Sequence, residues 1–340
     1  MTTLKSKSLL SHHKYVYKLE HGWDFPEFYD YYERTVASVW RHQEVAMEGD
    51  LRDWQFNSTP HERAVIAGIL KGFVSAELGI GCYWANEICR IFPKPEIQAM
   101  ARAFSFFETI HAAAYSYLND VLGLNEYEEF INDPIACSKI DTFFQEYPDK
   151  VSVAVFSGAG EGVSLFSSFA VLLSFNKDGR YKGLAQIISW SAIDEQIHSE
   201  AGCTLFRRLV GEVGLTDEEE QAIYEGFRLV VDKEFKFIDH IFNSAFISSI
   251  DPDELKAYIT NRANERLFTL GLQRIFRLST EELSKAKSIS AWFDPTIKGA
   301  SSSDFFAQSK SGDNYVAKPT QDYMSVDLTS LDLDSCLSYE

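Results

Sequence analysis

Apolar residues recur at intervals of three and four from Phe25 to about Lys287, and glycine and proline fall mainly between the apolar stretches. This period is typical of amphipathic α-helices that turn one apolar face toward a core. The sequence has no Asn-Gly or Asp-Gly turn between alternating strands, no glycine-rich phosphate loop and no internal repeat. The pattern therefore predicts an all-α protein built from long antiparallel helices.

Six long helices are expected, and residues that cap or break helices stand near their ends. The expected helices cover residues 59–92, 95–124, 149–175, 182–214, 216–242 and 251–272. The residues at these ends are Thr59-Pro60, Pro95, Gly123, the Asn176 to Gly179 turn, a Thr216-x-x-Glu219 capping box and Asp251-Pro252-x-Glu254.

The C-terminal end of the chain has a different character. Residues 300–340 are rich in serine and aspartate and show little helical period. Such a segment buries too little apolar surface to fold alone, so we expect a flexible tail. The predicted organisation is an N-terminal arm over residues 1–24, a helical domain over 25–299 and the tail over 300–340.

Charge and composition exclude several classes of function. The formal net charge is −18, whereas nucleic-acid binding draws on clustered lysine and arginine. No uninterrupted apolar run reaches the roughly 18 residues of a membrane span, and the N-terminus lacks the apolar segment of a secretion signal. We therefore expect a cytoplasmic protein with no nucleic-acid or membrane partner. The odd number of cysteines, without a C-x-x-C pair, indicates reduced thiols: Cys82, Cys89, Cys137, Cys203 and Cys336.

One apolar stretch, "FSFFETIHAAAYSYL", contains three polar side chains with potential chemistry. Glu108, His111 and Tyr115 stand at positions i, i+3 and i+7, which share one face of a helix. Burying a lone carboxylate costs several kcal/mol unless it is paired or bound to a metal. This face is therefore a candidate site.

A second helix repeats the Glu-x-x-His pattern, with Glu195 and His198 in "EQIH". Two further apolar helices each carry one buried-type glutamate, Glu77 in "GFVSAELGIG" and Glu161 in "FSGAGEGVSLF". One glutamate from each of two helices and Glu-x-x-His from each of two others is the ligand set of ferritin-like dinuclear carboxylate bundles. Four carboxylates balance the charge of two divalent ions, and the imidazoles complete each ion. The alternative, satisfied core groups, explains one such residue more readily than all six.

At these residues the chain resembles the small, radical-generating subunit of class I ribonucleotide reductase over essentially its whole length. The spacing of 31 residues from Glu77 to Glu108 and of 34 from Glu161 to Glu195 is similar to that family's pattern. The stretches "ETIHAAAY", "EGVSLFSSFA" and "SAIDEQIH" resemble its second, third and fourth ligand helices. The resemblance implies a ferritin-like bundle, a homodimer, two transition-metal ions per chain and a separate large subunit that reduces ribonucleoside diphosphates.

The resemblance also implies a route for the radical. The tyrosine one turn beyond the histidine, Tyr115, matches the family's radical tyrosine. Trp40, near the end of the first helix in "SVWRHQEV", matches the electron-relay tryptophan, and Asp194 matches the aspartate that links it to a ligand histidine. In the tail, Tyr315 in "GDNYVAK" is the best match to the relay tyrosine, with Tyr323 and Tyr339 as weaker alternatives. The end of the tail is expected to dock on the large subunit.

One residue departs from the family's pattern. Glu77 stands where most iron-using members have aspartate, and glutamate is typical of subclasses that use manganese or manganese with iron. Those subclasses often lose the radical tyrosine or carry a lysine one turn after this position, whereas this chain has Tyr115 and Gly81. The metals are therefore left open as iron, manganese with iron, or two manganese ions. The resting site of the radical is left open as Tyr115 or the metal centre itself.

Three other functions are compatible with a helical bundle. A dinuclear oxidase or monooxygenase acting on a small apolar substrate shares the ligand set, but it needs an apolar pocket beside the metals and has no use for the tail. A metal store would need more metal-facing positions. A metal-free scaffold leaves the six converging ligands without an explanation.

Overall fold

The computed structural model describes residues 8–11, 22–124, 132–243 and 247–293. Across these residues the chain is helical and contains no strand, so the predicted all-α class is confirmed. Most of the predicted N-terminal arm and all of the predicted tail, including Tyr315, Tyr323 and Tyr339, lie outside the described residues. The domain boundaries at residues 24 and 299 stay predictions.

The elements follow one another with short connections. The α-helices are α1 (Pro26–Val36), α2 (Glu48–Phe56), α3 (Pro60–Cys82), α4 (Cys89–Ile91), α5 (Pro95–Leu122), α7 (Pro134–Ile140), α8 (Asp149–Ala154), α9 (Phe166–Ser174), α10 (Lys182–Val213), α11 (Asp217–Asn243), α12 (Pro252–Thr269) and α13 (Thr280–Ser290). The 3₁₀ segments are η1 (His42–Glu44), η3 (Asp141–Phe144), η5 (Phe175–Asp178) and η6 (Ala291–Phe293). Two segments are π-helical, η2 (Tyr83–Ile88) and η4 (Val155–Ser164).

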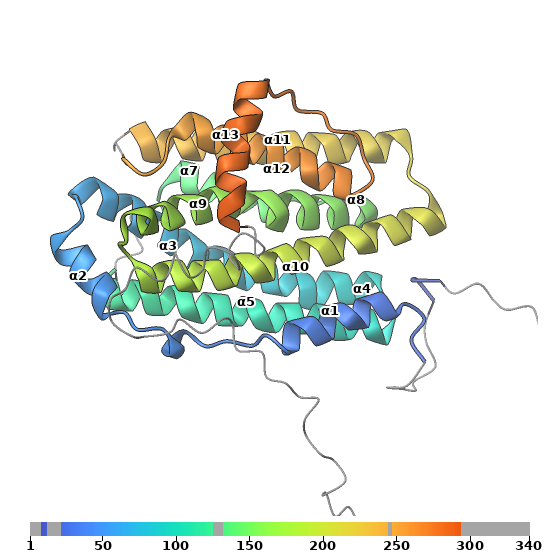
Figure 1. Ribbon diagram of the computed structural model, residues 1–340. Coiled ribbons are helices and arrows are strands. Elements are labelled where there is room, and N and C mark those ends of the chain that lie inside the picture. The colour runs from blue at the N-terminus through green and yellow to red at the C-terminus, as the bar shows by residue number, and fades with distance from the viewer. Residues whose placement is uncertain (1–7, 12–21, 125–131, 244–246, 294–340) are drawn as a thin grey trace, which may run out of the picture.

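The long helices form a layered bundle (Figure 1). α3 packs against α5, and α1 runs along α5 on the outer side. α10 packs against η4 and α9 in the middle of the bundle, and α11 and α12 cover the opposite side. α13 crosses α12 at a steep angle (Figure 1). The arrangement places α3, α5, η4 and α10 around a common interior.

The predicted helix ends are confirmed with one difference. Thr59 and Glu62 form a reciprocal capping box at α3, and Thr216 bonds reciprocally with Glu219 at the start of α11. Gly123, after α5, and Gly179, after η5, adopt the left-handed conformation that favours glycine, with φ of 73° and 77°. At α12, Asp251 accepts the backbone N–H groups of Asp253 and Glu254, but the Glu254 side chain does not return a bond. That end is an Asx cap and not a full capping box.

The π-helical segments were not predicted. η2 continues directly from α3, and η4 continues directly from α8, so each lies inside one long helical stretch. An apolar period of 3.6 residues differs too little from a wider turn to be recognised over six or ten residues. The only sequence sign is the glycine run at 158, 160 and 162 in η4. π-helical turns occur frequently at functional sites, and η4 contains Glu161.

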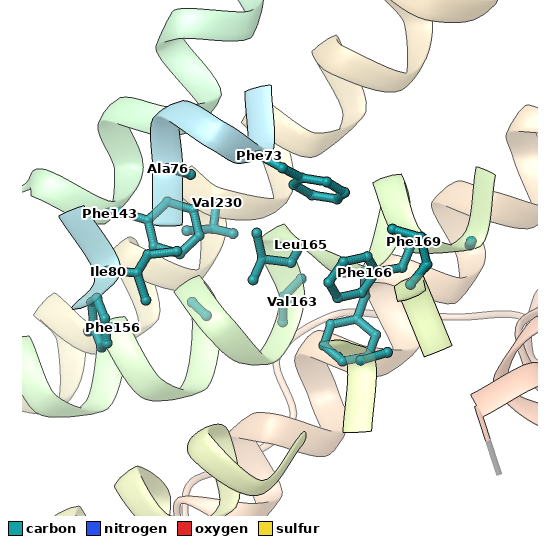
Figure 2. Packing of buried hydrophobic residues seen from close by; sticks show 14 of the residues in the cluster. Phe73, Ala76, Ile80, Phe143, Phe156, Val163, Leu165, Phe166, Phe169 and Val230 are labelled. Carbon is teal, nitrogen blue, oxygen red and sulfur yellow. The ribbon is translucent and has the colours of Figure 1, made fainter. Parts of the chain in front are cut away.

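Aromatic rings fill the interior around α3, η4 and α9. Phe73 of α3 lies with Phe166 and Phe169 of α9 in one apolar cluster, and Phe143 and Phe156 extend it along η3 and η4 (Figure 2). The ring centroids of Phe73 and Phe169 are 5.2 Å apart. These contacts fix the rotation of α3 and α9 relative to each other, which decides which residues face the interior.

Two helical stretches are long and apolar enough to cross a membrane by composition alone, residues Pro60–Ile91 and Asp149–Asp178. The sequence analysis did not identify them, because neither contains an uninterrupted apolar run of roughly 18 residues. The most apolar window of the second is entirely buried inside the bundle, and half of the first is buried. Both are packed as core helices of the bundle.

Candidate metal centre

Six side chains from four neighbouring helices converge in the interior of the bundle. Each residue is at most 1% exposed, and none lies at a helix end where fraying would displace it. They are Glu77 on α3, Glu108 and His111 on α5, Glu161 on η4, and Glu195 and His198 on α10. The structure therefore brings together all six residues predicted as metal ligands.

The six residues form two overlapping groups that could each hold one metal ion. The ligand atoms within each group lie within 4.8 Å of one another. The first ligand group is Glu77, Glu108, His111 and Glu195, and the second ligand group is Glu108, Glu161, Glu195 and His198. Because Glu108 and Glu195 belong to both groups, their carboxylates are placed to bridge two ions.

Each histidine turns its Nδ1 atom toward the carboxylates. His111 Nδ1 lies 3.1 Å from Glu108 Oε2 and 3.0 Å from Glu195 Oε1. His198 Nδ1 lies 2.8 Å from Glu108 Oε1 and 3.7 Å from Glu195 Oε2. The same atom type of each imidazole is therefore available to a metal ion.

The polar atoms of the cluster are poorly satisfied by protein partners. Both carboxylate oxygens of Glu77 and of Glu195 lack a partner with hydrogen-bond geometry among the described residues, as do both ring nitrogens of His198. An unsatisfied buried polar group costs about 1–3 kcal/mol, and more when charged. Lone pairs that converge without donors are the arrangement that a cation satisfies, so these residues fit a pair of divalent ions.

The pKa values of the cluster point the same way. Burial and the neighbouring carboxylates raise the pKa of Glu77 and of Glu161 well above the usual value for glutamate. The pKa of His198 is raised to about 10, because the nearby charge of Glu108 outweighs burial, and the pKa of His111 is also raised well above its usual value. These shifts reflect like charges packed closely together away from water, an arrangement that bound cations would stabilise.

A hydrogen-bonded chain leads from the first ligand group to a buried tryptophan. His111 Nε2 lies 3.2 Å from Asp194 Oδ2, and the Trp40 indole N–H donates to the same oxygen at 2.8 Å. Asp194 is 1% exposed and Trp40 is fully buried, so this chain lies inside the bundle and not at its surface. Trp40 lies four residues beyond the end of α1, in the connection to η1, and not on the helix. The helix ends at Val36, and Ala37 caps it, so the chain is free to turn this ring inward.

Tyr115 is buried one turn beyond His111, as predicted. Its ring stacks on Phe73 with centroids 4.7 Å apart, and its centroid lies 6.3 Å from that of His111. Its hydroxyl has no partner with hydrogen-bond geometry among the described residues, although the Ser191 hydroxyl is close enough to act on it. Burial and the charge of Glu77 raise the pKa of Tyr115 well above the usual value for tyrosine, so the phenol stays protonated.

One member of the site was missed at the level of sequence. The Trp84 indole N–H on η2 donates to Glu161 Oε1 at 2.5 Å, and this tryptophan is fully buried. Trp84 follows Glu77 by seven residues, which places the two on the same face of a helix. That spacing was an available signal, because it directs a second indole toward the candidate ligands.

Gly81 explains how α3 approaches α5 so closely. A Cβ atom at Gly81 would lie 3.2 Å from Glu108 Cβ and 3.4 Å from the Ser105 carbonyl oxygen. These distances are tighter than ordinary packing, so a larger residue would push against a candidate ligand. A side chain at position 81 would therefore require its α5 neighbours to shift by a few tenths of an ångström.

Comparison with known proteins gives a consistent result. A sequence profile of the family described as ribonucleotide reductase, small chain, matches residues 22–282. The probable ribonucleoside-diphosphate reductase small subunit 376L of Invertebrate iridescent virus 6 is 30% identical over 300 residues, covering 75% of this chain and 83% of the viral protein. The human ribonucleoside-diphosphate reductase subunit M2 is 26% identical over 269 residues, covering 75% of this chain and 66% of the human protein.

Solved structures show the same fold at lower identity. The ribonucleotide reductase R2 subunit from Clostridium botulinum superposes with a TM-score of 0.70 at 18% identity, covering 78% of this chain and 89% of that one. The dimanganese(II)-NrdF of Streptococcus sanguinis superposes with a TM-score of 0.69 at 15% identity, covering 83% of this chain and all of the other.

Proposed function

Because the chain belongs to the family of ribonucleotide reductase small chains, we propose that its six converging ligands hold the dinuclear metal centre that generates a radical at Tyr115. The chain is the small subunit of a ribonucleoside-diphosphate reductase, an oxidoreductase that acts together with a large subunit in making deoxyribonucleotides. The observation that carries the proposal is the pair of overlapping ligand groups that share Glu108 and Glu195.

The protein contributes ligands, geometry and exclusion of water. When bound, two transition-metal ions oxidised by O2 or a reduced oxygen species would supply the oxidising power that takes one electron and the phenol proton from Tyr115. Glu77 and His111 complete one position, and Glu161 and His198 complete the other. Because all six ligands are buried, bulk water has no direct access to the centre.

Tyr115 is suited to hold an unpaired electron for a long time. Its ring is fully buried and lies against Phe73, which is far harder to oxidise than tyrosine. The absence of a hydrogen-bond partner with good geometry among the described residues limits proton exchange at the phenol oxygen. We therefore assign Tyr115 the role of the stored radical.

Trp40, Asp194 and Tyr315 form the proposed relay toward the large subunit. The Trp40 indole N–H donates to Asp194, so the carboxylate can hold the proton as the indole loses and regains an electron. His111 bonds the same aspartate oxygen, which links the relay to the first ligand group. Tyr315 lies outside the described residues, and its role rests on the sequence resemblance alone.

The proposed partners are a second copy of the chain and the large subunit. A homodimer is supported by large apolar side chains on the outer faces of two long helices, Leu78 (61% exposed) and Phe106 (52% exposed). The solved structure of Rnr4 from Saccharomyces cerevisiae, 17% identical to this chain, is itself a homodimer. We propose that the C-terminal tail docks on the large subunit and that the enzyme is cytoplasmic, with no nucleic-acid or membrane partner.

The oxidase or monooxygenase alternative lacks support in the described structure. Cavities of about 530, 570 and 480 Å³, and a small apolar one of about 30 Å³, occur in the described part of the molecule. None of the six candidate ligands lines any of these four cavities. A substrate oxidised at the metals would need such a pocket beside them.

The metal pair is proposed as iron, manganese with iron, or two manganese ions. Carboxylate and imidazole ligands do not separate iron from manganese by affinity alone. Metal analysis and electron paramagnetic resonance on protein purified without added metal would identify the pair.

Replacement of single ligands tests the metal site. We expect wild-type protein to bind about two transition-metal ions per chain, and Glu108→Ala and His198→Ala to bind at most about one, because each substitution removes a ligand of the second group. Metal content after dialysis is the measurement. Glu96→Ala is the matched control, because Glu96 is a buried glutamate on the same helix that accepts the Phe25 N–H and belongs to neither group. Full metal content in both ligand variants would refute the assignment.

A further inference from the structure

The two candidate ligand groups differ in how their histidines are supported. His111 has an outer partner, because its Nε2 atom bonds Asp194. His198 has none with hydrogen-bond geometry among the described residues, on either ring nitrogen. Metal-binding histidines are almost always oriented by a bond to the second nitrogen. Something other than such a bond must hold the second ligand group in place.

Two buried arginines lie directly behind the second ligand group. Arg262 and Arg266 are on α12, one turn apart, and are 6% and 7% exposed. α12 packs against both η4 and α10, the elements that carry Glu161, Glu195 and His198. The arginines therefore stand where they can act on both ligand elements at once.

Arg262 links η4 to α10 by hydrogen bonds to two residues, each of which directly follows a ligand in sequence. Its Nε atom donates to the Gly162 carbonyl at 2.5 Å, and Gly162 follows Glu161. Its terminal nitrogen donates to Gln196 Oε1 at 2.9 Å, and Gln196 follows Glu195. The guanidinium carbon also lies 3.2 Å from the ring centroid of Phe166, which covers one face of the cation.

Arg266 fills the remaining space between the same two elements. It donates to the Ser199 hydroxyl at 3.4 Å, and Ser199 follows His198. A Cβ atom at Gly162 would lie 2.7 Å from both Arg266 Cδ and Ser199 Oγ, so glycine is required for this close approach. Each ligand that is specific to the second group is thus followed in sequence by a residue that an α12 arginine contacts.

The arrangement has a cost that a purely structural role does not explain. Among the described residues, neither guanidinium forms an ion pair with a carboxylate, and the Arg266 Nε atom has no partner. Burial lowers the pKa of Arg262 to about 10, which still leaves it charged at neutral pH. Apolar residues of similar volume would pack here without burying charge. Unlike apolar residues, the arginines provide fixed hydrogen-bond donors to two different helices.

We propose that Arg262 and Arg266 are positioning residues that hold Glu161 and His198, the two ligands specific to the second group, in register, so that the second metal position depends on α12 and the first does not. The inference rests on the proposed dinuclear metal site. It assigns to α12, which carries no ligand, control over the occupancy of one of the two positions. The π-helical turn at η4 is held against α10 by the same contacts.

Titration of the full-length, metal-free protein with Mn²⁺ tests this proposal. Bound and free Mn²⁺ are counted by electron paramagnetic resonance, which also separates a coupled pair from a single bound ion. We expect Arg262→Met to weaken the second ion by about 10–100-fold and to leave the first within about threefold of wild type, as for loss of an outer partner. Arg262→Lys should not restore the second ion, because one ammonium group does not span Gly162 and Gln196.

Two further variants separate positioning from a general loss of structure. Gln196→Met removes one acceptor of Arg262 without a large change of volume, and it should weaken the second ion selectively even where Arg262→Met fails to fold. Arg208→Met is the control, because Arg208 is an exposed α10 arginine that pairs with Glu27 at 2.7 Å, and both ions should bind as in wild type.

These measurements distinguish failure of this inference from failure of the proposed metal site. Two ions in wild type with unchanged affinities in Arg262→Met and Gln196→Met would overturn this inference alone. Equal weakening of both ions would also overturn it, because it would show a structural role. Failure of the wild-type protein to bind two ions would overturn the proposed metal site and this inference with it.

Discussion

At the scale of single residues, the Asp194 carboxylate bonds to two aromatic rings. One of its oxygens receives the Trp40 indole N–H and contacts His111 Nε2, so the three groups form one unit. The ring centroids of Trp40 and His111 are only 5.9 Å apart, with planes 27° from parallel. Replacement of Trp40 therefore alters the relay without removing a ligand of either group.

We expect Trp40→Phe to reduce turnover with the large subunit at least about 100-fold, a barrier increase of about 2.7 kcal/mol. Phenylalanine fills most of the volume, but it is much harder to oxidise and has no N–H to bond Asp194. Metal content and any tyrosyl radical signal should stay at the wild-type level. Trp54→Phe is the control, because Trp54 lies on α2 and belongs to neither the relay nor a ligand group. The Arg63 guanidinium carbon lies 6.0 Å from the centroid of its ring. Wild-type turnover in Trp40→Phe would remove this residue from the relay.

Tyr115→Phe should abolish the tyrosyl radical signal in electron paramagnetic resonance while about two metal ions stay bound. The ring still stacks on Phe73, and only the oxidisable hydroxyl is lost. Since that hydroxyl has no well-oriented partner, the folded state should lose little stability. Tyr117→Phe is the matched control, two residues further along α5, where the ring contacts His42. Unchanged nucleotide reduction in Tyr115→Phe would show that this tyrosine is only packing.

The candidate ligands could be found from sequence because their residue types, spacing and apolar surroundings agree. Glu108 and His111 are conspicuous in an apolar helix, since burial of such groups is costly. The pairing of Trp40 with Asp194 was anticipated from the family resemblance alone, because 154 residues separate the two positions. The Arg262 contacts were not predicted, because an arginine on an amphipathic helix is usually at the surface.

At the scale of elements, α2 caps the helix that carries Asp194, Glu195 and His198. The Asp50 carboxylate accepts the backbone N–H groups of Gly183 and Leu184 at 2.9 and 2.7 Å, at the start of α10. The chain enters α10 through Tyr181, whose φ of 53° is in the left-handed region that side chains rarely adopt. A carboxylate from another helix thus does the work of a local N-cap.

This cap makes the stability depend on pH. Burial raises the pKa of Asp50 to about 6, although the two backbone N–H groups act in the opposite direction. A carboxyl whose pKa is higher in the folded state binds its proton more tightly there, so its contribution is greatest at low pH and is lost between about pH 4 and pH 6. Asparagine resembles the protonated acid at every pH.

The unfolding free energy of wild type relative to Asp50→Asn should therefore fall by about 2–3 kcal/mol between pH 4 and pH 7. Urea unfolding of both proteins, without metal, measures this difference. The contributions of all other titrating groups cancel, because both proteins contain them. A constant difference across this range would contradict the raised pKa.

Helix ends were predicted well and helix interiors less well. Thr59, Thr216 and Gly123 act locally, so their sequence neighbours suffice to identify the ends of helices. The π-helical turns of η2 and η4 contain residues that contact each other from far along the chain, as in the bond from Trp84 to Glu161. The apolar period does not record such contacts.

At the scale of the whole molecule, the C-terminal tail is the proposed link to the partner. Residues 322–340 carry five acidic and no basic side chains, with four leucines between them, and they lie outside the described residues. Such a segment has too little apolar surface to fold alone, so its leucines are expected to find a surface on the large subunit.

Deletion of residues 327–340 should leave metal content and any radical unchanged and should eliminate nucleotide reduction. A synthetic peptide of these residues should inhibit the intact enzyme by competing for the large subunit. The measurements are turnover and binding of the large subunit by the truncated protein. Normal association and turnover after the deletion would show that the tail does not dock.

The shared ligands Glu108 and Glu195 also have a topological consequence. The four carboxylates are separated by 31, 53 and 34 residues along the chain, so bound ions would close three loops between α3 and α10. In a chain-entropy description, closing a loop of this length with a covalent link stabilises a fold by about 3–4 kcal/mol. Bound ions would then cross-link the helices through the middle of the bundle. Unfolding of the loaded protein would begin outside those loops, at α1, α12 and α13, and the ligand-bearing helices α3, α5, η4 and α10 would open last.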